Sequence, residues 1–474
     1  MQIPFIGGAY TSRSSNINAQ TCINLFPVVN KQDAKAVVAL YGTPGLNLFS
    51  TLISGEGYVV RAAYVANDTL YAVVQDRVYS VTSAGVATLL GTISTTSGSV
   101  FMADNGIQVI IVDSTTNGYI ITLATNVLAI IADADFPDAA CVTFQDGYFI
   151  VVAESTGKIY ISGLYSGTTW DPLEFTTAEG RPDDALTVIS NTHDLWIFGE
   201  KSTEVFYNSG NADFPFERIQ GALIDIGIGA AASTTKINGQ LYWFSDRRQV
   251  CRSVGYQYEF ISTPDIDYQL STYSTVSDAI GFNYVIDGHS FLVLVFPSAG
   301  KTWVYDVTTE FWHEWQSWYT TAVPWSRHRS NCAVQFGSNW IVGDYDNGKL
   351  YSLSMTAYTD ESHSIRRQRV TQVIDKDRLR IVFHKVEIEF EAGVGLTGGV
   401  QGEDPQAILE WSDDGGHVWS NQHWRGIGKI GEYKNRAIWR RLGMSRNRIF
   451  RFTISDPVKV VIIGSDAQLE ACKD

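Results

Sequence analysis

The sequence lacks the patterns that mark export and membrane insertion. No stretch approaches about 18 uninterrupted apolar residues, the length that a membrane-spanning helix needs. The first residues, Met1–Gly8, carry neither a basic region nor an apolar core of signal-peptide length. Low-complexity tracts and long blocks of like charge are also missing. We therefore expect a folded chain without a membrane segment.

Cysteine is scarce and follows no metal-binding pattern. The five cysteines are odd in number and include no C-x-x-C pair. This excludes a zinc ribbon and argues against a disulfide framework. We expect most of them to be buried thiols of a protein that folds in a reducing cytosol. They are Cys22, Cys141, Cys251, Cys332 and Cys472.

Catalytic signatures are missing as well. The eight histidines form no helix-spaced pair and no H-E-x-x-H motif, and the sequence has no G-x-S-x-G. Aspartate and glutamate are abundant, but no pair can be assigned as acid and base. We expect a protein that is not an enzyme and that has no catalytic residue, no metal and no cofactor.

The charge that is present is unevenly distributed. Of the formal net charge of −15, residues 361–474 contribute +2 and residues 1–360 contribute −17. An acidic body with one basic part indicates surfaces of different character. The length of 474 residues exceeds one ordinary core, so two or three domains are expected.

A short pattern recurs seven times in the middle of the chain. Each copy has a polar turn, an apolar run, a tight turn and a second apolar run, and most copies end in an aliphatic–Tyr pair. The copies recur about every 45 residues, a period typical of propeller blades. The fifth copy lacks the tyrosine, so six or seven blades are predicted. The copies are Asp68–Val81, Asn105–Thr122, Asp146–Gly163, Thr192–Gly210, Asn238–Ser253, Asp287–Asp306 and Gly337–Leu353.

The composition favours strands throughout. Runs rich in Val, Ile, Tyr and Phe are bounded by Gly, Asn, Asp and Ser, and no long amphipathic helix is indicated. Apolar runs such as Phe291–Phe296 fit strands buried on both faces by stacked blades. The predicted fold is all-β, with a β-propeller over residues 51–360.

Two further parts flank the predicted propeller. Residues 1–50 are rich in Gly, Ser and Asn, which indicates an extended N-terminal arm with short strands. Residues 361–474 lose the repeat and predict a C-terminal β-sandwich-like domain. There Val386, Ile388 and Phe390 alternate with charged residues, as in a strand with one buried face.

Two motifs match known ligand loops only in part. Ser298–Thr302 contains G-K-T, but Val295 stands where a phosphate loop needs glycine, so we interpret it as a hairpin turn. Asp344–Gly348 has the wrong spacing for an EF-hand. Its Asn347-Gly348 pair predicts a type I′ hairpin instead.

Two aromatic motifs have a structural and a functional interpretation. Ser412–Trp419 matches the Asp-box pattern S-x-D-x-G-x-x-W of sialidase propellers, which is a stabilising turn rather than a catalytic group. Phe311–Tyr319 holds five aromatic residues. We favour packing or a subunit interface there over a platform for sugar or nucleic acid.

Residues 425–451 form a basic strip, with nine basic residues against Glu432 alone. Three interpretations stay open: contact with phosphate, a solvated strand pair with arginines over aromatic rings, and contact with an acidic neighbour. The candidate assembly contacts in this strip are Trp439, Arg440, Arg441, Arg446 and Arg448.

Six short sequence motifs at the two ends of the chain are distinctive when taken together. They are Asn24–Pro27, Gly42–Gly45, Trp411–Trp419, Gly428–Gly431, Arg436–Gly443 and Phe450–Val458. In order and spacing the chain resembles the packaged-DNA stabilisation family of short-tailed bacteriophages, the tail accessory, hub or head-closure proteins. That family has no catalytic motif, so the resemblance implies no active-site residue in this chain.

The resemblance implies a structural virion protein of the tail, assembled in the host cell cytoplasm. Its relatives form a ring, hexameric in well-studied cases, that extends and closes the portal channel and retains the packaged DNA. The implied partners are further copies of the chain, a portal or adaptor protein, a tail needle or plug, and a tailspike or fibre. DNA would pass without sequence-specific binding, and an acidic wall would repel its phosphates.

Two other functions stay open. A propeller glycan-binding protein or glycosidase would use the Asp-box region, although a sialidase-type propeller is expected to repeat that box across its blades. A DNA-binding protein would use Arg440–Arg451 and would bind duplex DNA with strongly salt-dependent affinity.

Overall fold

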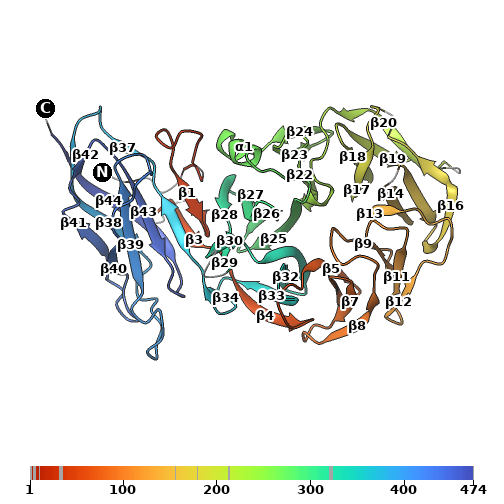
Figure 1. Cartoon of the computed structure of the whole chain (residues 1–474), viewed down its shortest axis with the longest axis horizontal. Coiled ribbons are helices and arrows are strands. Elements are labelled where there is room, and N and C mark those ends of the chain that lie inside the picture. Colours follow the sequence, from red (N-terminus) through yellow and green to blue (C-terminus); the bar gives the residue numbers. More distant parts are fainter. Residues whose placement is uncertain are drawn as a thin grey trace.

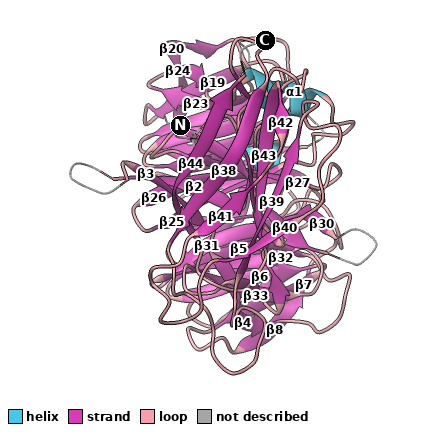
Figure 2. Cartoon of the chain, turned by 90° about the vertical axis from the view of Figure 1, so that its left-hand side faces the viewer, coloured by secondary structure: helices cyan, strands magenta, loops and turns pink. Residues whose placement is uncertain are grey.

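The chain is built almost entirely of β-strands (Figure 2). The computed structural model describes residues 3, 7–9, 11–30, 36–154, 156–178, 180–211, 214–319 and 324–472. Within these residues the only helices are α1 (Pro264–Ser271) and the short 3-10 helix η1 (Ala231–Ser233). None of the described helices has the length and apolar character needed to cross a membrane. The all-β prediction is confirmed.

Seven four-stranded antiparallel units form a ring in the described part of the chain (Figure 1). The strands of blades 1 to 4 are β5 (Val60–Ala66), β6 (Thr69–Val74), β7 (Arg77–Val81), β8 (Ala87–Thr92), β9 (Phe101–Asp104), β10 (Gln108–Val112), β11 (Gly118–Thr122), β12 (Val127–Ile130), β13 (Ala139–Gln145), β14 (Tyr148–Ala153), β15 (Ile159–Gly163), β16 (Ser166–Thr176), β17 (Ala185–Asn191), β18 (Asp194–Gly199), β19 (Thr203–Asn208) and β20 (Phe216–Ile224). Those of blades 5 to 7 are β21 (Thr235–Ile237), β22 (Gln240–Phe244), β23 (Val250–Val254), β24 (Gln257–Phe260), β25 (Ile280–Ile286), β26 (His289–Phe296), β27 (Lys301–Asp306), β28 (Phe311–Glu314), β31 (Ser330–Phe336), β32 (Asn339–Asp344), β33 (Lys349–Ser354) and β4 (Gly45–Thr51).

Each repeated sequence pattern is the middle hairpin of one blade. The first copy is β6–β7 and the seventh is β32–β33, and the degenerate fifth copy forms β22–β23 within a complete blade. The polar turn that opens a copy needs positive φ, which Asn-Gly and Asp-Gly pairs supply. Asn238 and Gly239, for example, have φ of 51° and 79°.

The ring closes with a strand from the opposite end of the sequence. Blade 7 takes its outer strand, β4, from the N-terminal arm, and β4 pairs antiparallel with β33. Apolar clusters then fill the spaces between successive blades. The cluster that joins blade 7 to blade 1 includes Val60, Leu70 and Ile341, each fully buried.

The C-terminal part forms two sheets that pack as a sandwich beside blade 6 (Figure 1). One sheet contains β1 (Thr21–Ile23), β36 (Arg367–Val370), β43 (Asn447–Ile454), β39 (Gln406–Ser412), β40 (His423–Gly426) and the short β37 (Ile374–Asp375). The other contains β2 (Leu25–Val29), β3 (Val38–Gly42), β44 (Val461–Ala471), β38 (Ile381–Phe390), β41 (Ala437–Arg440) and β42 (Met444–Ser445). The predicted inward face of β38 is confirmed, because Val386 and Ile388 are fully buried.

The N-terminal arm holds the two parts together. Strand β1 runs parallel to β28 of blade 6 and antiparallel to β36 of the sandwich, so one sheet continues from the propeller into the sandwich. The next two strands join the second sandwich sheet through β3 and β44. A single apolar core therefore extends from Phe296 of blade 6 through Leu25 and Leu40 to Phe450 of the sandwich.

Two short strand pairs complete the described structure. Strands β29 (Gln316–Trp318) and β30 (Trp325–Arg327) form a hairpin between blades 6 and 7. Strands β34 (Thr359–Asp360) and β35 (His363–Ser364) follow blade 7, and β34 lies parallel to β4.

One predicted turn is wrong. At Asn347-Gly348 only the glycine has positive φ, 63°, so the turn is not type I′. The amide of Asn347 instead donates to the Tyr351 hydroxyl at 2.7 Å, and its backbone bridges to Tyr58. These contacts hold the residue outside the left-handed region that a type I′ turn requires.

Candidate functional site: the joint between propeller and sandwich

Asn24 is the residue at which the arm, the propeller and the sandwich meet. It is fully buried and has φ of 54°, a conformation that asparagine tolerates better than most residues. Its side-chain amide donates to the carbonyl oxygens of Gln316 (2.9 Å) and Arg366 (2.8 Å), and its Oδ1 accepts from the backbone N–H of Gln316 (2.9 Å). We call Asn24, Gln316, Asp360 and Arg366, with the residues they bind, the joint.

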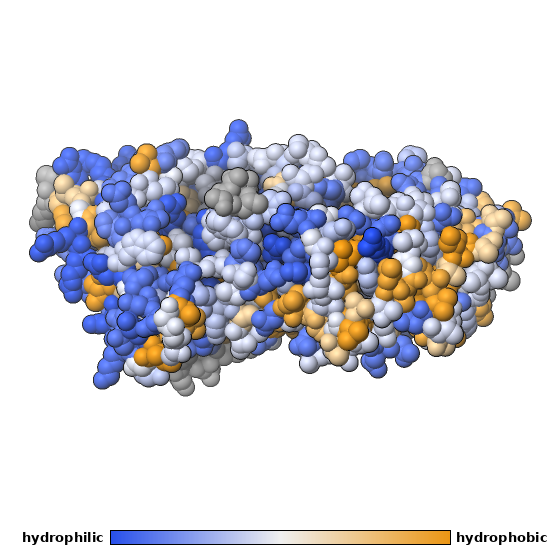
Figure 3. Space-filling view, turned by 60° about the horizontal axis from the view of Figure 1, so that its bottom comes forward, coloured by the Kyte–Doolittle hydropathy of each residue, from blue (hydrophilic) through white to orange (hydrophobic). Residues whose placement is uncertain are grey.

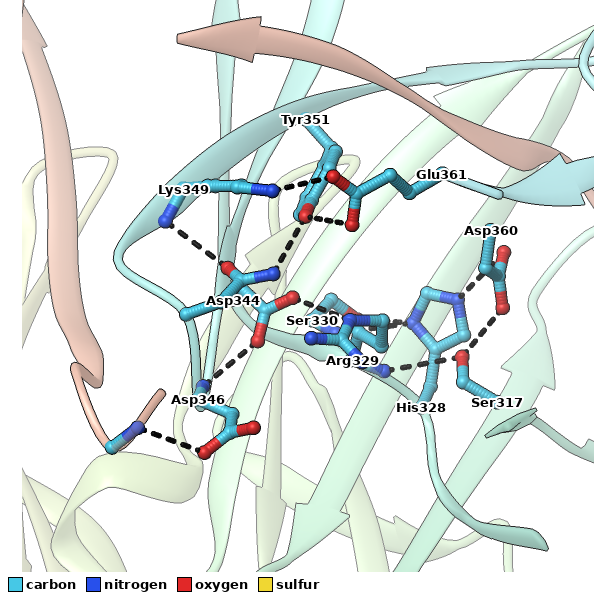
Figure 4. A network of polar contacts seen from close by, with 12 residues as sticks. Ser317, His328, Arg329, Ser330, Asp344, Asp346, Lys349, Tyr351, Asp360 and Glu361 are labelled. Atoms are coloured by element: carbon cyan, nitrogen blue, oxygen red, sulfur yellow. Dashed lines mark hydrogen bonds and ion pairs between the residues drawn. The ribbon is translucent and has the colours of Figure 1, made fainter. Parts of the chain in front are cut away.

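A buried polar network extends the joint along blade 7 (Figure 4). Ser317 donates to Asp360 at 2.6 Å, which fastens the hairpin after blade 6 to the segment that leaves blade 7. Arg329 forms an ion pair with Asp344 at 2.6 Å. The Tyr351 hydroxyl donates to Glu361 at 2.9 Å. These contacts connect three segments that are distant in sequence.

Three residues of this network have the types of a catalytic triad but not its geometry. Ser330 Oγ lies 2.7 Å from His328 Nδ1, and His328 Nε2 lies 4.0 Å from Asp360 Oδ1, too far for a hydrogen bond. All three residues are at most 1% exposed, so no substrate reaches them. The ring of His328 stacks on Trp315 with centroids 3.7 Å apart.

Burial shifts the titration of this network. It raises the pKa of Asp360 to about 6, although Ser317 and nearby arginines oppose the shift. Burial, together with Arg329, lowers the pKa of His328 to about 3. His313 in blade 6 is also fully buried, which lowers its pKa to about 4. The histidines are therefore neutral packing groups at physiological pH.

Two of the five candidate assembly residues lie inside the chain. Trp439 is 1% exposed and donates from Nε1 to the carbonyl of His423 at 2.8 Å. Arg448 is 2% exposed, pairs with both carboxylate oxygens of Asp413 at 2.6 and 2.8 Å, and stacks over Phe383. These two residues stabilise the sandwich.

The other three candidates are exposed. Arg440 and Arg441 lie at the end of β41, and neither contacts a carboxylate of the described residues. Arg446 donates to the carbonyl of Arg378 at 2.6 Å. The basic strip is thus divided between interior ion pairs and free surface cations. Contact of these residues with another subunit stays a prediction.

The Asp box forms the stabilising turn that its residues predict. Asp414 accepts from the Ser412 hydroxyl (2.6 Å) and the backbone N–H of Val418 (2.9 Å), which lowers the pKa of Asp414. Arg451 stacks over the ring of Trp419, 4.0 Å from its centroid. The Ser412 hydroxyl and the Asp414 carboxylate are thus used within the turn.

The remaining motifs also have structural roles. Gly300, with φ of 61°, turns the chain between β26 and β27, and no helix follows it. In the aromatic run, Trp312 is buried and donates to the carbonyl of Ile261 at 3.0 Å. Trp315 packs between Tyr284 and His328. The packing interpretation of this run is confirmed for these residues.

The inner strands of blades 1, 2, 6 and 7 line a cavity of about 690 Å³. Its buried Arg61 donates five hydrogen bonds, to backbone carbonyls of the two neighbouring loops and to Thr95. The guanidinium is therefore saturated and has no donor left for an anionic ligand. Among the described residues, no group of three His, Cys, Asp or Glu side chains could hold a metal ion.

No local sequence pattern indicates the buried partners of the joint. Asn24 lies in one of the distinctive N-terminal motifs, but no neighbouring residue in the sequence indicates its contacts with residues about 300 positions away. All five cysteines are free, and three of them are buried.

Two family models match the chain and together cover most of its length. Residues 1–358 match the model described as "Bacteriophage P22 Gp10, beta-propeller". Residues 366–470 match the model described as "Bacteriophage P22 Gp10, beta-sandwich". A comparison with curated proteins gives no match.

Two solved structures are similar at low sequence identity. The WD40 β-propeller domain of Doa1 is 11% identical with a TM-score of 0.42, over 65% of this chain and 96% of that one. PorZ, a surface component of the type-IX secretion system of Porphyromonas gingivalis, is 11% identical with a TM-score of 0.40, over 80% of this chain and 46% of that one.

Proposed function

The chain belongs to the family of bacteriophage P22 Gp10, and from this premise we propose that it is the tail hub, a ring that extends and closes the portal channel. The family is one of structural phage proteins, so the chain is a structural protein of a phage virion. The proposed hub retains the packaged DNA and attaches further tail components.

The joint is the structural observation that supports this role. A ring that holds back pressurised DNA must transmit load between its parts without opening. Here one sheet passes from blade 6 into the sandwich through β1, and one apolar core fills both parts. The N-terminal arm also closes the propeller. Propeller and sandwich therefore resist separation as one body.

The charge of the chain supports a conduit for DNA. The net charge is −15, and the acidic residues lie mainly before residue 361. An acidic wall repels phosphate, so DNA can slide past it without sticking. The structure argues against the interpretation of the basic strip as a DNA-binding site, because Asp413 neutralises Arg448 and Glu410 neutralises Arg451.

The proposed partners follow from the proposed role. They are further copies of the chain in a hexameric ring, a portal or adaptor protein, a needle or plug, and a tailspike or fibre. The glycan-binding alternative is not favoured, because the Asp box lies in the sandwich and its polar groups are used within the turn.

Native mass spectrometry of the chain, alone and with its portal protein, tests the proposal. A closed ring that forms on the portal is the expected result. Phage particles that lack the chain should also lose their packaged DNA after purification. A chain that stays monomeric with the portal, or particles that retain DNA without it, would contradict the proposed function.

A further inference from the structure

One edge of the propeller lacks the protection that exposed strands normally carry. β8 and β12 are the outermost strands of blades 1 and 2, and each pairs on one side only. Neither contains a charged residue or a proline, although edge strands commonly carry these to block association. The next blades have such protection: β16 carries Asp171, Pro172 and Glu174, and β20 carries Glu217 and Arg218.

The side chains on this edge are apolar and exposed. Leu89 is 52% exposed, Val127 56% and Ile130 59%. The two strands contact each other, since a Cβ at Gly91 would lie 2.9 Å from Leu128 Cδ2. Figure 3 shows apolar side chains gathered over the half of the molecule that holds blades 1 to 3. We call the exposed side chains of β8 and β12 the bare edge.

The charges around the bare edge restrict its partner. Arg77 of β7, which is exposed and lies opposite Thr92, is the one cation beside β8 in the paired strands. The sequence then has no lysine or arginine from residue 78 to residue 157. Nucleic acids and anionic lipid surfaces need cations, so neither fits this edge. Carboxylates do flank it, because Asp133 and Asp135 follow β12 directly. A suitable partner therefore presents apolar side chains together with cations.

The sandwich of the same chain has such a surface. At residues 423–441, which we call the basic wall, β40 and β41 lie at the side of the sandwich and a loop connects them. Ile430 is 57% exposed and Tyr433 73%. Lys434 and Arg440 of the same segment are also exposed, and neither pairs with a carboxylate in the part of the chain that the structure describes.

The bare edge and the basic wall lie in different halves of the long axis (Figure 1). Two unlike patches that fit each other generate head-to-tail association, which closes into a ring when the rotation permits. We propose that the bare edge of one copy binds the basic wall of the next copy. This inference rests on the proposed function, and it names the surfaces through which the ring forms.

A photo-cross-linking amino acid in place of Leu89 or Ile130 tests the contact in assembled phage particles. The expected product joins two copies of the chain, with the attached peptide inside residues 423–441. The matched control carries the same group in place of Leu173, which is 82% exposed on the protected strand β16. Cross-links to another protein, to another part of the chain, or at the control position with equal yield would overturn the inference.

Charge reversal gives a second readout. The double variant R440E/R441E should weaken assembly by at least about 10-fold, as for other paired interface charges, while R446E should leave it unchanged. Circular dichroism verifies that the variants fold. If wild-type chain is absent from particles, the proposed function fails. If a ring forms normally with R440E/R441E and yields no cross-link from the bare edge, only this inference fails.

Discussion

Replacement of Asn24 by alanine should lower the free energy of unfolding by more than the loss of one hydrogen bond would. The side chain makes three buried hydrogen bonds, each contributing about 1 kcal/mol. The backbone at φ of 54° adds roughly 1 kcal/mol, because alanine lacks asparagine's tolerance of this region. N24A should therefore lower the free energy of unfolding by about 4 kcal/mol.

Two further variants separate the two contributions. N24G keeps the left-handed backbone accessible and removes only the hydrogen bonds, so its expected loss is about 3 kcal/mol. N67A changes an exposed asparagine with φ of 45°, so its loss should be roughly 1 kcal/mol. Urea titration followed by tryptophan fluorescence measures each value. If N24A cost no more than N67A, the Asn24 hydrogen bonds would not hold the joint.

Other contacts give three smaller predictions. R448M should destabilise the chain by about 3 kcal/mol because it removes the hydrogen bonds that the buried guanidinium donates to Asp413 and to the carbonyl of Leu442, while R446M should be near neutral in the same urea titration. The free energy of unfolding should fall by about 1.4 kcal/mol per pH unit for each of His313 and His328 as the pH drops from 6.5 towards 4, because the unfolded chain binds these protons and the folded chain does not. The raised pKa of Asp360 offsets part of this loss, because the folded chain binds that proton first. Glutamine at either histidine should reduce the pH dependence in urea titrations. D414A should lower stability in the same urea titration, because it removes two hydrogen bonds of the turn, without changing glycan-array binding. Array signals that depend on this carboxylate would revive the glycan-binding alternative.

The blades were predictable because their information is local. Each middle hairpin lies within about 20 residues of sequence, so its turn residues and apolar runs follow one another directly. The alternation at Val386 and Ile388 was informative for the same reason. The outer strand of blade 7 was not predictable, because β4 pairs with a strand about 300 residues later and has no local sign of its partner.

The basic strip shows the corresponding limit for sites. A run of arginines in sequence indicates a charged surface, yet Arg448 is interior because Asp413, 35 residues earlier, neutralises it. Only the fold brings the two together, and it also places the guanidinium of Arg448 over the aromatic ring of Phe383. Sequence order could not separate this arginine from the exposed Arg440 and Arg441.

The joint accounts for two of the six distinctive sequence motifs, Asn24–Pro27 and Gly42–Gly45, both of which lie in the N-terminal arm. A Cβ at Gly42 would lie 2.5 Å from Arg367 Nε, and one at Gly45 would lie 2.5 Å from the carbonyl oxygen of Ala357. Both glycines are therefore required where the arm passes from the sandwich to blade 7. Between them, Thr43 donates its backbone N–H to Asn24. Blades tolerate exchange of one apolar residue for another, because any suitable side chain fills the space between them. The arm has no such freedom at Gly42 and Gly45, because a larger side chain would collide there with Arg367 or with the backbone of Ala357.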